Sequence, residues 1–169
     1  MSYIYAEKDN GFINIYCDTK ITFADHIGQE YSREQAKLVQ VYGIVKTIVI
    51  SPEISISFAG NKRSLASELC YWLFEKKTFS AQELLDMAFT LHKENEEDAI
   101  EFIIVSCEDN KPTINCIKNR TIAKDVSSAW IGSSIARSAF LEKTKKENKG
   151  SHDAFLEVVN GCAAGNVGG

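Results

Sequence analysis

The stretch MSYIYAEKDNGFINIYCD, residues 1–18, contains the clearest structural signal in the sequence. Two apolar or alternating runs flank Asn10 and Gly11, and this dipeptide tolerates positive φ at both positions, which makes it the strongest short signal for a β-hairpin. The sequence therefore predicts two antiparallel strands, with Ser2 directly before the first and Asp18 at the end of the second. These strands are expected over residues 3–8 and 12–18.

A second pair of strands is predicted further along the chain. The β-branched run 37–50 is typical of a strand, and Gly43 within it marks a place where a β-bulge fits. A turn at residues 51–53 leads into a further run, 54–60, that ends at a glycine. The second pair of strands is therefore expected to form another hairpin.

The hydrophobic period then becomes helical and predicts two pairs of helices. Ser80 and Glu83 form a capping box at the start of the second helix. The third helix is expected to begin near Ser133, and Ser151 is expected to cap the fourth. In the first helix one face is expected to pack in the core: Leu65, Leu69, Trp72 and Leu73. The buried stripe expected in the second helix consists of Leu84, Met87, Ala88 and Leu91. The third helix is expected to run through Ile135, Ala139 and Phe140, and the apolar residues of the fourth are Phe155, Leu156, Val159 and Cys162.

Between the helix pairs, runs 101–107 and 112–118 predict two more strands around a polar turn, and 119–132 predicts one further short strand or extended segment. Strand pairs that alternate with helix pairs do not fit the βαβ pattern of a parallel sheet. The order instead predicts an α+β fold of two antiparallel sheets with helices on the outside. We expect one domain over residues 1–169.

Composition narrows the class of function. The net charge of −4 argues against a nucleic-acid binder, which needs a basic patch to displace counterions from phosphates. The lysine-rich run 143–149 is interpreted as a solvated helix end. The sequence shows no secretory signal after Met1 and no apolar run of roughly 20 residues that would span a bilayer. A cytoplasmic protein without a membrane partner is expected.

The cysteines and histidines do not indicate a metal site. The five cysteines are scattered without C-x-x-C spacing, which favours buried free thiols over a zinc site or a disulfide framework. His92 and His152 lie on polar segments without metal-ligand spacing and are expected to be solvated. No metal or organic cofactor is expected.

These strings, in this order, resemble the proteasome β-subunit superfamily, and within it the bacterial HslV-type members. The resemblance covers nearly the whole chain. It rests on the opening hairpin, on VKTIVISPEISISFAGN at 45–61, on the helix with Leu65 and Leu69, and on AWIGSSIARS at 129–138. It implies a four-layer αββα sandwich, the fold of N-terminal nucleophile hydrolases, whose members in this superfamily cut peptide bonds.

The resemblance gives Ser2 the position of the nucleophile. In such enzymes the side-chain hydroxyl of the first residue attacks, and the α-amine of the same residue is the base. An α-amine has a reference pKa of about 7.7–8.0 and can accept a proton at physiological pH. A serine hydroxyl is a weak nucleophile without an adjacent base. Ser2 fits this chemistry once Met1 is removed.

The resemblance also implies supporting catalytic residues. Asp18 takes the position of the carboxylate that holds the amine cluster, and Ser133 that of a buried serine. Gly60 is the candidate for a backbone N–H that stabilises the oxyanion. A strand lysine would favour ionisation of the hydroxyl by its positive charge. Lys46 is the candidate, although counting back without gaps from the Ser51-Pro52 turn and residues 58–60 puts Val45 at the family's lysine position. A β-bulge, for which Gly43 offers a place, would bring Lys46 there instead.

Partners and an alternative follow from the same resemblance. A hydrolase of this class takes peptide or unfolded-protein substrates, assembles as a homo-oligomeric ring and in some cases works with an ATP-dependent unfoldase. The Gly-rich end after residue 162 suggests that the last strands of the family fold are missing. Because Asp18 alone can cap a turn and Ser133 alone can cap a helix, a noncatalytic assembly or binding protein with the same fold stays open.

Overall fold

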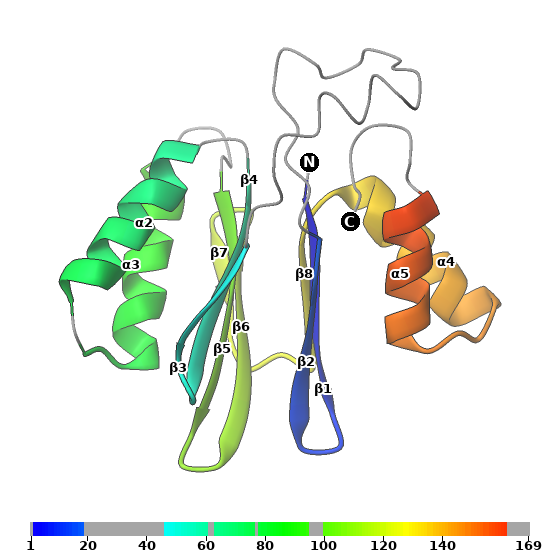
Figure 1. Cartoon of the computed structure of the whole chain (residues 1–169), viewed down its shortest axis with the longest axis horizontal. Coiled ribbons are helices and arrows are strands. Elements are labelled where there is room, and N and C mark those ends of the chain that lie inside the picture. The colour runs from blue at the N-terminus through cyan, green and yellow to red at the C-terminus, as the bar shows by residue number, and fades with distance from the viewer. Residues whose placement is uncertain (1, 19–45, 61–62, 77, 95–99, 162–169) are drawn as a thin grey trace.

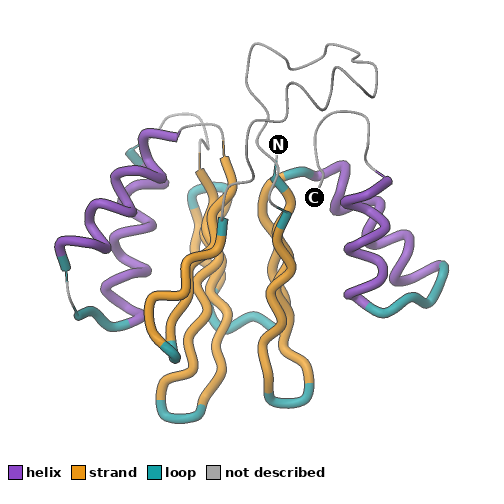
Figure 2. Tube along the Cα trace, in the orientation of Figure 1, coloured by secondary structure: helices purple, strands orange, loops and turns teal. Residues whose placement is uncertain are grey.

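The computed structural model describes residues 2–18, 46–60, 63–76, 78–94 and 100–161. Figure 1 shows four layers: a helix pair, a sheet, a second sheet and a second helix pair. Figure 2 shows that the strands of both sheets run along the same general direction, with the helices outside them. The predicted α+β sandwich of two antiparallel sheets is confirmed.

One sheet has three strands in the order β2-β1-β8. Strands β1 (Tyr3–Asp9) and β2 (Phe12–Cys17) form the predicted opening hairpin. Its turn has φ of 48° at Asn10 and 84° at Gly11. This is the positive-φ conformation on which the prediction of the hairpin was based. Strand β8 (Ser128–Gly132) pairs with the other edge of β1.

The other sheet has five strands in the order β3-β4-β5-β6-β7, all antiparallel. The predicted hairpins around residues 51–53 and 108–111 are both present. The strands are β3 (Thr47–Ser51), β4 (Ile54–Gly60), β5 (Ile100–Glu108), β6 (Lys111–Lys118) and β7 (Thr121–Ala123).

Four described helices cover the outer faces of the sheets. Helices α2 (Arg63–Glu75) and α3 (Ala81–Lys93) pack on the five-stranded sheet. Helices α4 (Ser134–Lys146) and α5 (Ser151–Gly161) pack on the three-stranded sheet. A third apolar cluster fills the space between the sheets: Ile4, Ala6, Ala59, Ile103, Ile114, Cys116, Ala129 and Ile131.

The segment 119–132 departs from the prediction of a single strand or extended segment. It forms two strands that belong to different sheets, because β7 pairs with β6 whereas β8 pairs with β1. The chain therefore crosses between the sheets here. This crossing brings the Gly132–Ser133 turn to the start of β1, since Gly132 lies opposite Tyr3.

Two predictions about individual side chains were wrong. His92 is fully buried instead of solvated, because Nδ1 lies 2.6 Å from the Ile100 carbonyl oxygen and Nε2 accepts the Arg120 N–H at 2.9 Å. Ser151 does not cap α5 but donates its hydroxyl to Glu7 at 2.8 Å. Two apolar residues of the predicted helices face solvent, Ile135 at 65% and Leu156 at 45% exposure.

The described cysteines are free thiols, as predicted, but the prediction that they are buried was wrong for most of them. Cys116 is buried, but Cys70 and Cys107 are exposed and Cys17 is half-buried. Cys70 and Cys107 lie at exposed positions of α2 and β5. Their burial was predicted from the apolar residues around them in the sequence, but even a mostly apolar helix or strand exposes some of its side chains to solvent.

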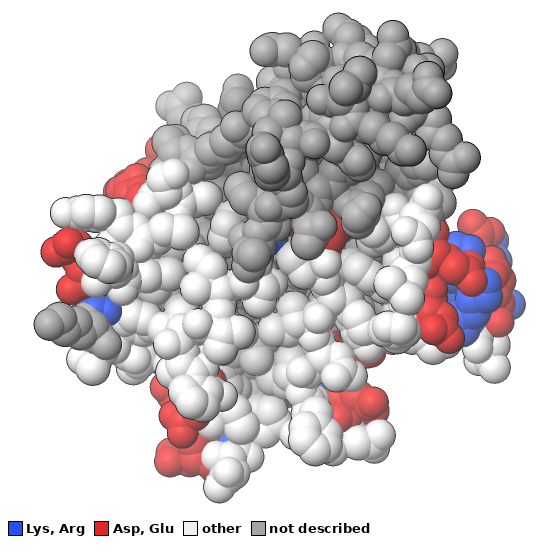
Figure 3. Space-filling view, in the orientation of Figure 1, with Lys and Arg blue, Asp and Glu red and all other residues white. Residues whose placement is uncertain are grey.

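The lysine-rich run 143–149 is more than a solvated helix end. Lys143 and Lys149 both form ion pairs with Glu157 at 2.6 Å, so the run ties α4 to α5. These contacts lower the pKa of Glu157 to about 2 through hydrogen bonds from the two lysines. Figure 3 shows the basic side chains at this end of the molecule interleaved with acidic ones.

Several predictions lie outside the described residues: the start of the strand run 37–50, the bulge at Gly43, Cys162 and the Gly-rich end. No helix in the described part of the chain is long and apolar enough to cross a membrane.

The capping box predicted at the start of α3 is confirmed and allows a stability test. The Ser80 hydroxyl accepts the Glu83 N–H, and the Glu83 carboxylate accepts the Ser80 N–H at 2.9 Å. We expect Ser80→Ala to lower the free energy of unfolding by about 1 kcal/mol. Urea denaturation measures the change, with exposed Ser67→Ala in α2 as the control, for which a change within about 0.5 kcal/mol is expected. Equal effects of both substitutions would contradict the capping role.

Candidate active site

The candidate site is built around the start of β1. Asp18 directly follows β2 and is 1% exposed. Its Oδ2 accepts the Tyr3 N–H at 2.6 Å, and its own N–H donates to the Tyr3 carbonyl at 3.3 Å. Asp18 therefore holds the backbone of the residue next to Ser2, and Ser2 itself is half-buried.

Lys46 forms a buried ion pair with Asp18. The Lys46 ammonium donates to Asp18 Oδ1, and the side chains are 5% and 0% exposed. Lys46 directly precedes β3, and its carbonyl accepts the Phe58 N–H of β4 at 2.9 Å. The pair therefore joins the end of a strand in one sheet to the start of a strand in the other.

A register irregularity in β3 explains why a count without gaps along the sequence points to Val45 instead of Lys46. Val49 lies opposite Ser55, whereas Ser51 lies opposite Ile54, so β3 advances two residues while β4 advances one. One additional residue in β3 shifts the pairing of all preceding residues of this strand by one position, which reverses the face to which each side chain points. With this shift the structure places Lys46 against Asp18, while Val45 lies outside the described residues.

Burial dominates the electrostatics of Asp18. Removal from water raises the pKa of Asp18 above its ordinary value of 3.8, while the Lys46 charge and the hydrogen bonds from Lys46 and Tyr3 oppose this shift. The two oxygens of the carboxylate are engaged by different partners, one by Lys46 and one by the Tyr3 backbone. A buried carboxylate with a specific charge partner is a common feature of functional sites.

Ser133 fixes Ser2 from the other side. Its N–H donates to the Ser2 carbonyl oxygen at 2.6 Å. Its side chain is 1% exposed and caps α4 by accepting the Ala136 N–H at 3.2 Å. The predicted helix cap and the predicted burial of Ser133 are thus both observed.

Gly132 makes this close approach possible. Its φ is +90°, and a Cβ at this position would lie 1.9 Å from the Ser2 carbonyl oxygen and 3.3 Å from Ala59 Cβ. Any side chain here would collide with the Ser2 backbone, so only glycine fits. Gly132 was part of the quoted string 129–138, but its role depends on a distant contact and was not predicted.

Gly60 is the exposed last residue of β4 and lies opposite Ile100 of β5. It directly follows Ala59, the residue beside the Gly132 turn. The end of β4 therefore borders the region around Ser2. The structure thus brings Asp18 and Lys46 into contact, places Ser133 on Ser2, and leaves Gly60 next to this cluster; the catalytic roles of these residues stay predictions.

The comparisons with known proteins bear on the fold. No protein-family model matches the sequence, and no curated protein matches it. The structure is similar to the crystal structure of eukaryotic HslV from Trypanosoma brucei, with a TM-score of 0.57 and 16% sequence identity. The similarity covers 97% of this chain and 93% of that chain. At this level of identity the similarity shows a shared fold, so the chain has a proteasome-like fold.

A double-mutant cycle tests the coupling of Asp18 to Lys46. We expect Asp18→Asn and Lys46→Met each to lower the free energy of unfolding by about 3–5 kcal/mol, because each removes one charge of the buried pair and leaves the other charge buried. The double substitution removes both charges and should cost clearly less than the sum. Urea denaturation of the four proteins gives the coupling energy. Additive effects would show that the two charges do not interact in solution.

The raised pKa of Asp18 predicts a pH dependence. The folded chain binds the Asp18 proton more tightly than the unfolded chain does, so this residue's contribution to stability is lost as pH rises from about 3.8 through the raised pKa. We therefore expect the stability of the wild type relative to the Asp18→Asn/Lys46→Met double variant to decrease between pH 3 and pH 7. Both proteins share the exposed carboxylates, whose effects cancel. A relative stability that increases over this range would mean that the pKa of Asp18 is lowered instead.

Proposed function

We propose that the chain is a proteasome-like N-terminal nucleophile hydrolase that cleaves peptide bonds. Ser2 is the nucleophile and its free α-amine is the base once Met1 has been removed. The observation that supports this proposal best is the buried Asp18–Lys46 pair, which is bonded to the backbone of Tyr3 next to Ser2. A packed sandwich alone does not require two desolvated charges at this position.

In the proposed reaction the Ser2 hydroxyl gives its proton to the α-amine while Oγ attacks the carbonyl carbon of the scissile peptide. The resulting oxyanion collapses to an ester on Ser2, and the leaving amine takes the proton. Water, activated by the same α-amine, then hydrolyses the ester and releases the second product. The chain returns to its starting state with no other reactant consumed.

Each supporting residue has a defined role in this proposal. The positive charge of Lys46 stabilises negative charge that develops on Ser2 Oγ, and Asp18 holds Lys46 and the Tyr3 backbone in place. Ser133 fixes the Ser2 carbonyl. Gly60 supplies a backbone N–H to the oxyanion.

The proposal includes partners that rest on the resemblance to the proteasome superfamily. The substrates are peptides or unfolded protein chains, and the assembly is a homo-oligomeric ring in the cytoplasm. An ATP-dependent unfoldase is an optional partner of such a ring.

A noncatalytic assembly or binding protein is the second candidate. One observation favours it: the two carboxylate oxygens of Asp18 and the ammonium of Lys46 already take part in interactions that hold the ends of the strands together. The pair has a structural use even without chemistry, and a fold does not fix a function.

Intact-mass spectrometry after incubation with a peptide epoxyketone tests the proposal. This reagent reacts with a hydroxyl and a free α-amine on one residue. We expect a single adduct on wild-type protein that lacks Met1, and none on Ser2→Ala. Ser134→Ala, an exposed serine of α4, is the matched control and should react like the wild type.

The outcomes separate the two candidates. A Ser2-dependent adduct supports the hydrolase. Protein that lacks Met1 and forms no adduct supports the noncatalytic candidate, and an adduct that persists in Ser2→Ala refutes the assignment of Ser2.

A further inference from the structure

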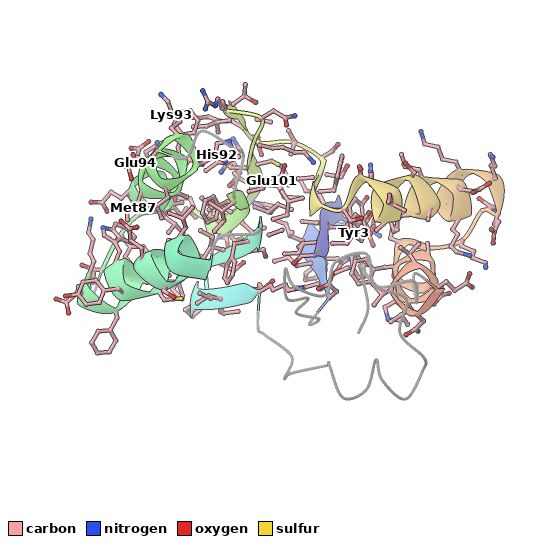
Figure 4. The ribbon with its side chains drawn as sticks, turned by 90° about the horizontal axis from the view of Figure 1, so that it is seen from above. Tyr3, Met87, His92, Lys93, Glu94 and Glu101 are labelled. Atoms are coloured by element: carbon pink, nitrogen blue, oxygen red, sulfur yellow. The ribbon has the colours of Figure 1, made fainter. Side chains whose placement is uncertain are left out.

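We propose that Glu101 is a positioning residue for Ser2. This inference rests on the proposed function, because it concerns how the nucleophile is held. Glu101 lies in β5, opposite Ala59 of β4, and so belongs to the five-stranded sheet. Figure 4 shows it between α3 and the three-stranded sheet that carries Tyr3. No feature of the local sequence distinguishes Glu101 from a solvated strand residue.

The Glu101 carboxylate crosses from its own sheet to the end of β8. Its Oε2 accepts the Gly132 N–H at 2.7 Å, across 31 residues of sequence. A hydrogen bond from a backbone N–H to an ionised carboxylate is shorter and stronger than a neutral one. Glu101 therefore fixes the peptide group that leads into the turn with positive φ.

The next N–H in the chain carries this constraint to Ser2. The Ser133 N–H donates to the Ser2 carbonyl oxygen at 2.6 Å. A side chain at Gly132 would prevent this hydrogen bond, because a Cβ there would lie 1.9 Å from the same oxygen. Two successive N–H groups thus connect the Glu101 carboxylate to the backbone of the nucleophile.

A cation holds the carboxylate in place. Lys118 Nζ lies 3.5 Å from Glu101 Oε1, and the two side chains are 20% and 13% exposed. The same ammonium lies 3.1 Å from the centroid of the Trp130 ring, which belongs to β8 two residues before Gly132. A cation over an aromatic face is attracted to it. Glu101 and Lys118 together therefore hold β8 at two points near its end.

The consequence for Ser2 is one of position, not chemistry. Glu101 does not touch the reacting atoms, but a misplacement of about 1 Å in a reacting group can reduce a rate about 100-fold. We expect Glu101→Ala to slow the reaction of Ser2 with a peptide epoxyketone by about this factor. Glu101→Gln keeps an oxygen acceptor for the Gly132 N–H and should retain the rate within about tenfold.

The experiment compares wild type, Glu101→Ala, Glu101→Gln, Glu101→Asp and a matched control. Glu108→Ala is the control, because Glu108 lies at the far end of the same strand and its carboxylate accepts the Ala81 N–H at 3.2 Å. Intact mass gives the rate of adduct formation, and hydrogen exchange measured by NMR gives the protection of the Ser133 N–H. Glu101→Asp keeps the charge but withdraws the carboxylate by one methylene, so it should be slow even if Glu101→Ala does not fold.

Slow reaction and faster Ser133 exchange in Glu101→Ala or Glu101→Asp, with rescue by Glu101→Gln and no effect of Glu108→Ala, support the proposal. Wild-type rates in Glu101→Ala and Glu101→Asp, or an equal loss in Glu108→Ala, overturn it. If the wild type forms no adduct, the proposed function fails. The exchange rate of the Ser133 N–H then decides alone whether Glu101 positions the backbone of Ser2. Exchange that is faster in Glu101→Asp but not in Glu101→Gln supports the positioning role, and unchanged exchange refutes it.

Discussion

The buried ion pair between Asp18 and Lys46 is the interaction on which the candidate site depends. The two residues border strands of different sheets, so the pair closes one end of the sandwich. Removing two charges from water is costly, and mutual attraction offsets this cost only when the geometry is good and the remaining oxygens are hydrogen-bonded. Here the second oxygen of Asp18 accepts the Tyr3 N–H, which reduces the cost of burial without cancelling it and fixes the chain next to Ser2.

A second constraint acts on the other side of Ser2. The Gly132–Ser133 turn comes within hydrogen-bond distance of the Ser2 carbonyl, and the positive φ of Gly132 leaves no space for a side chain. The turn is held by Glu101 from the opposite sheet. Ser2 therefore lies between two sets of contacts, Asp18–Lys46 and Gly132–Glu101. Each set connects the three-stranded sheet to the five-stranded sheet. This arrangement gives the start of β1 a fixed position, which a nucleophile needs.

Much of the fold was predictable because its signals are local. The Asn10-Gly11 turn defined the opening hairpin, and the Ser80–Glu83 pair defined the start of α3. The assignment of β8 to the sheet of β1 was not predictable in this way, since strand pairing over long distances leaves no mark in a short window. The burial of His92 was missed for the same reason: its partners, Ile100 and Arg120, lie on later segments of the chain.

The candidate site was predictable only in part. Asp18 and Ser133 were identified through the resemblance to the proteasome superfamily, and their positions depend on turns that have clear sequence signals. The register of Lys46 depends on a bulge between Val49 and Ser51, and a run of alternating β-branched residues does not reveal an inserted residue. The role of Glu101 was missed because its carboxylate accepts the backbone N–H of Gly132. Every residue except proline has such an N–H, so the sequence at Gly132 does not indicate a carboxylate partner.

The similarity in fold to eukaryotic HslV leaves the chemistry to be decided at Ser2. The most direct measurement is a crystal structure of the protein after reaction with a peptide epoxyketone. We expect the inhibitor to be bonded to both Oγ and the α-nitrogen of Ser2, with the Lys46 ammonium between Ser2 Oγ and Asp18. A structure in which Met1 still precedes Ser2, or in which the inhibitor is bound to another residue, would contradict the assignment of Ser2 as an N-terminal nucleophile.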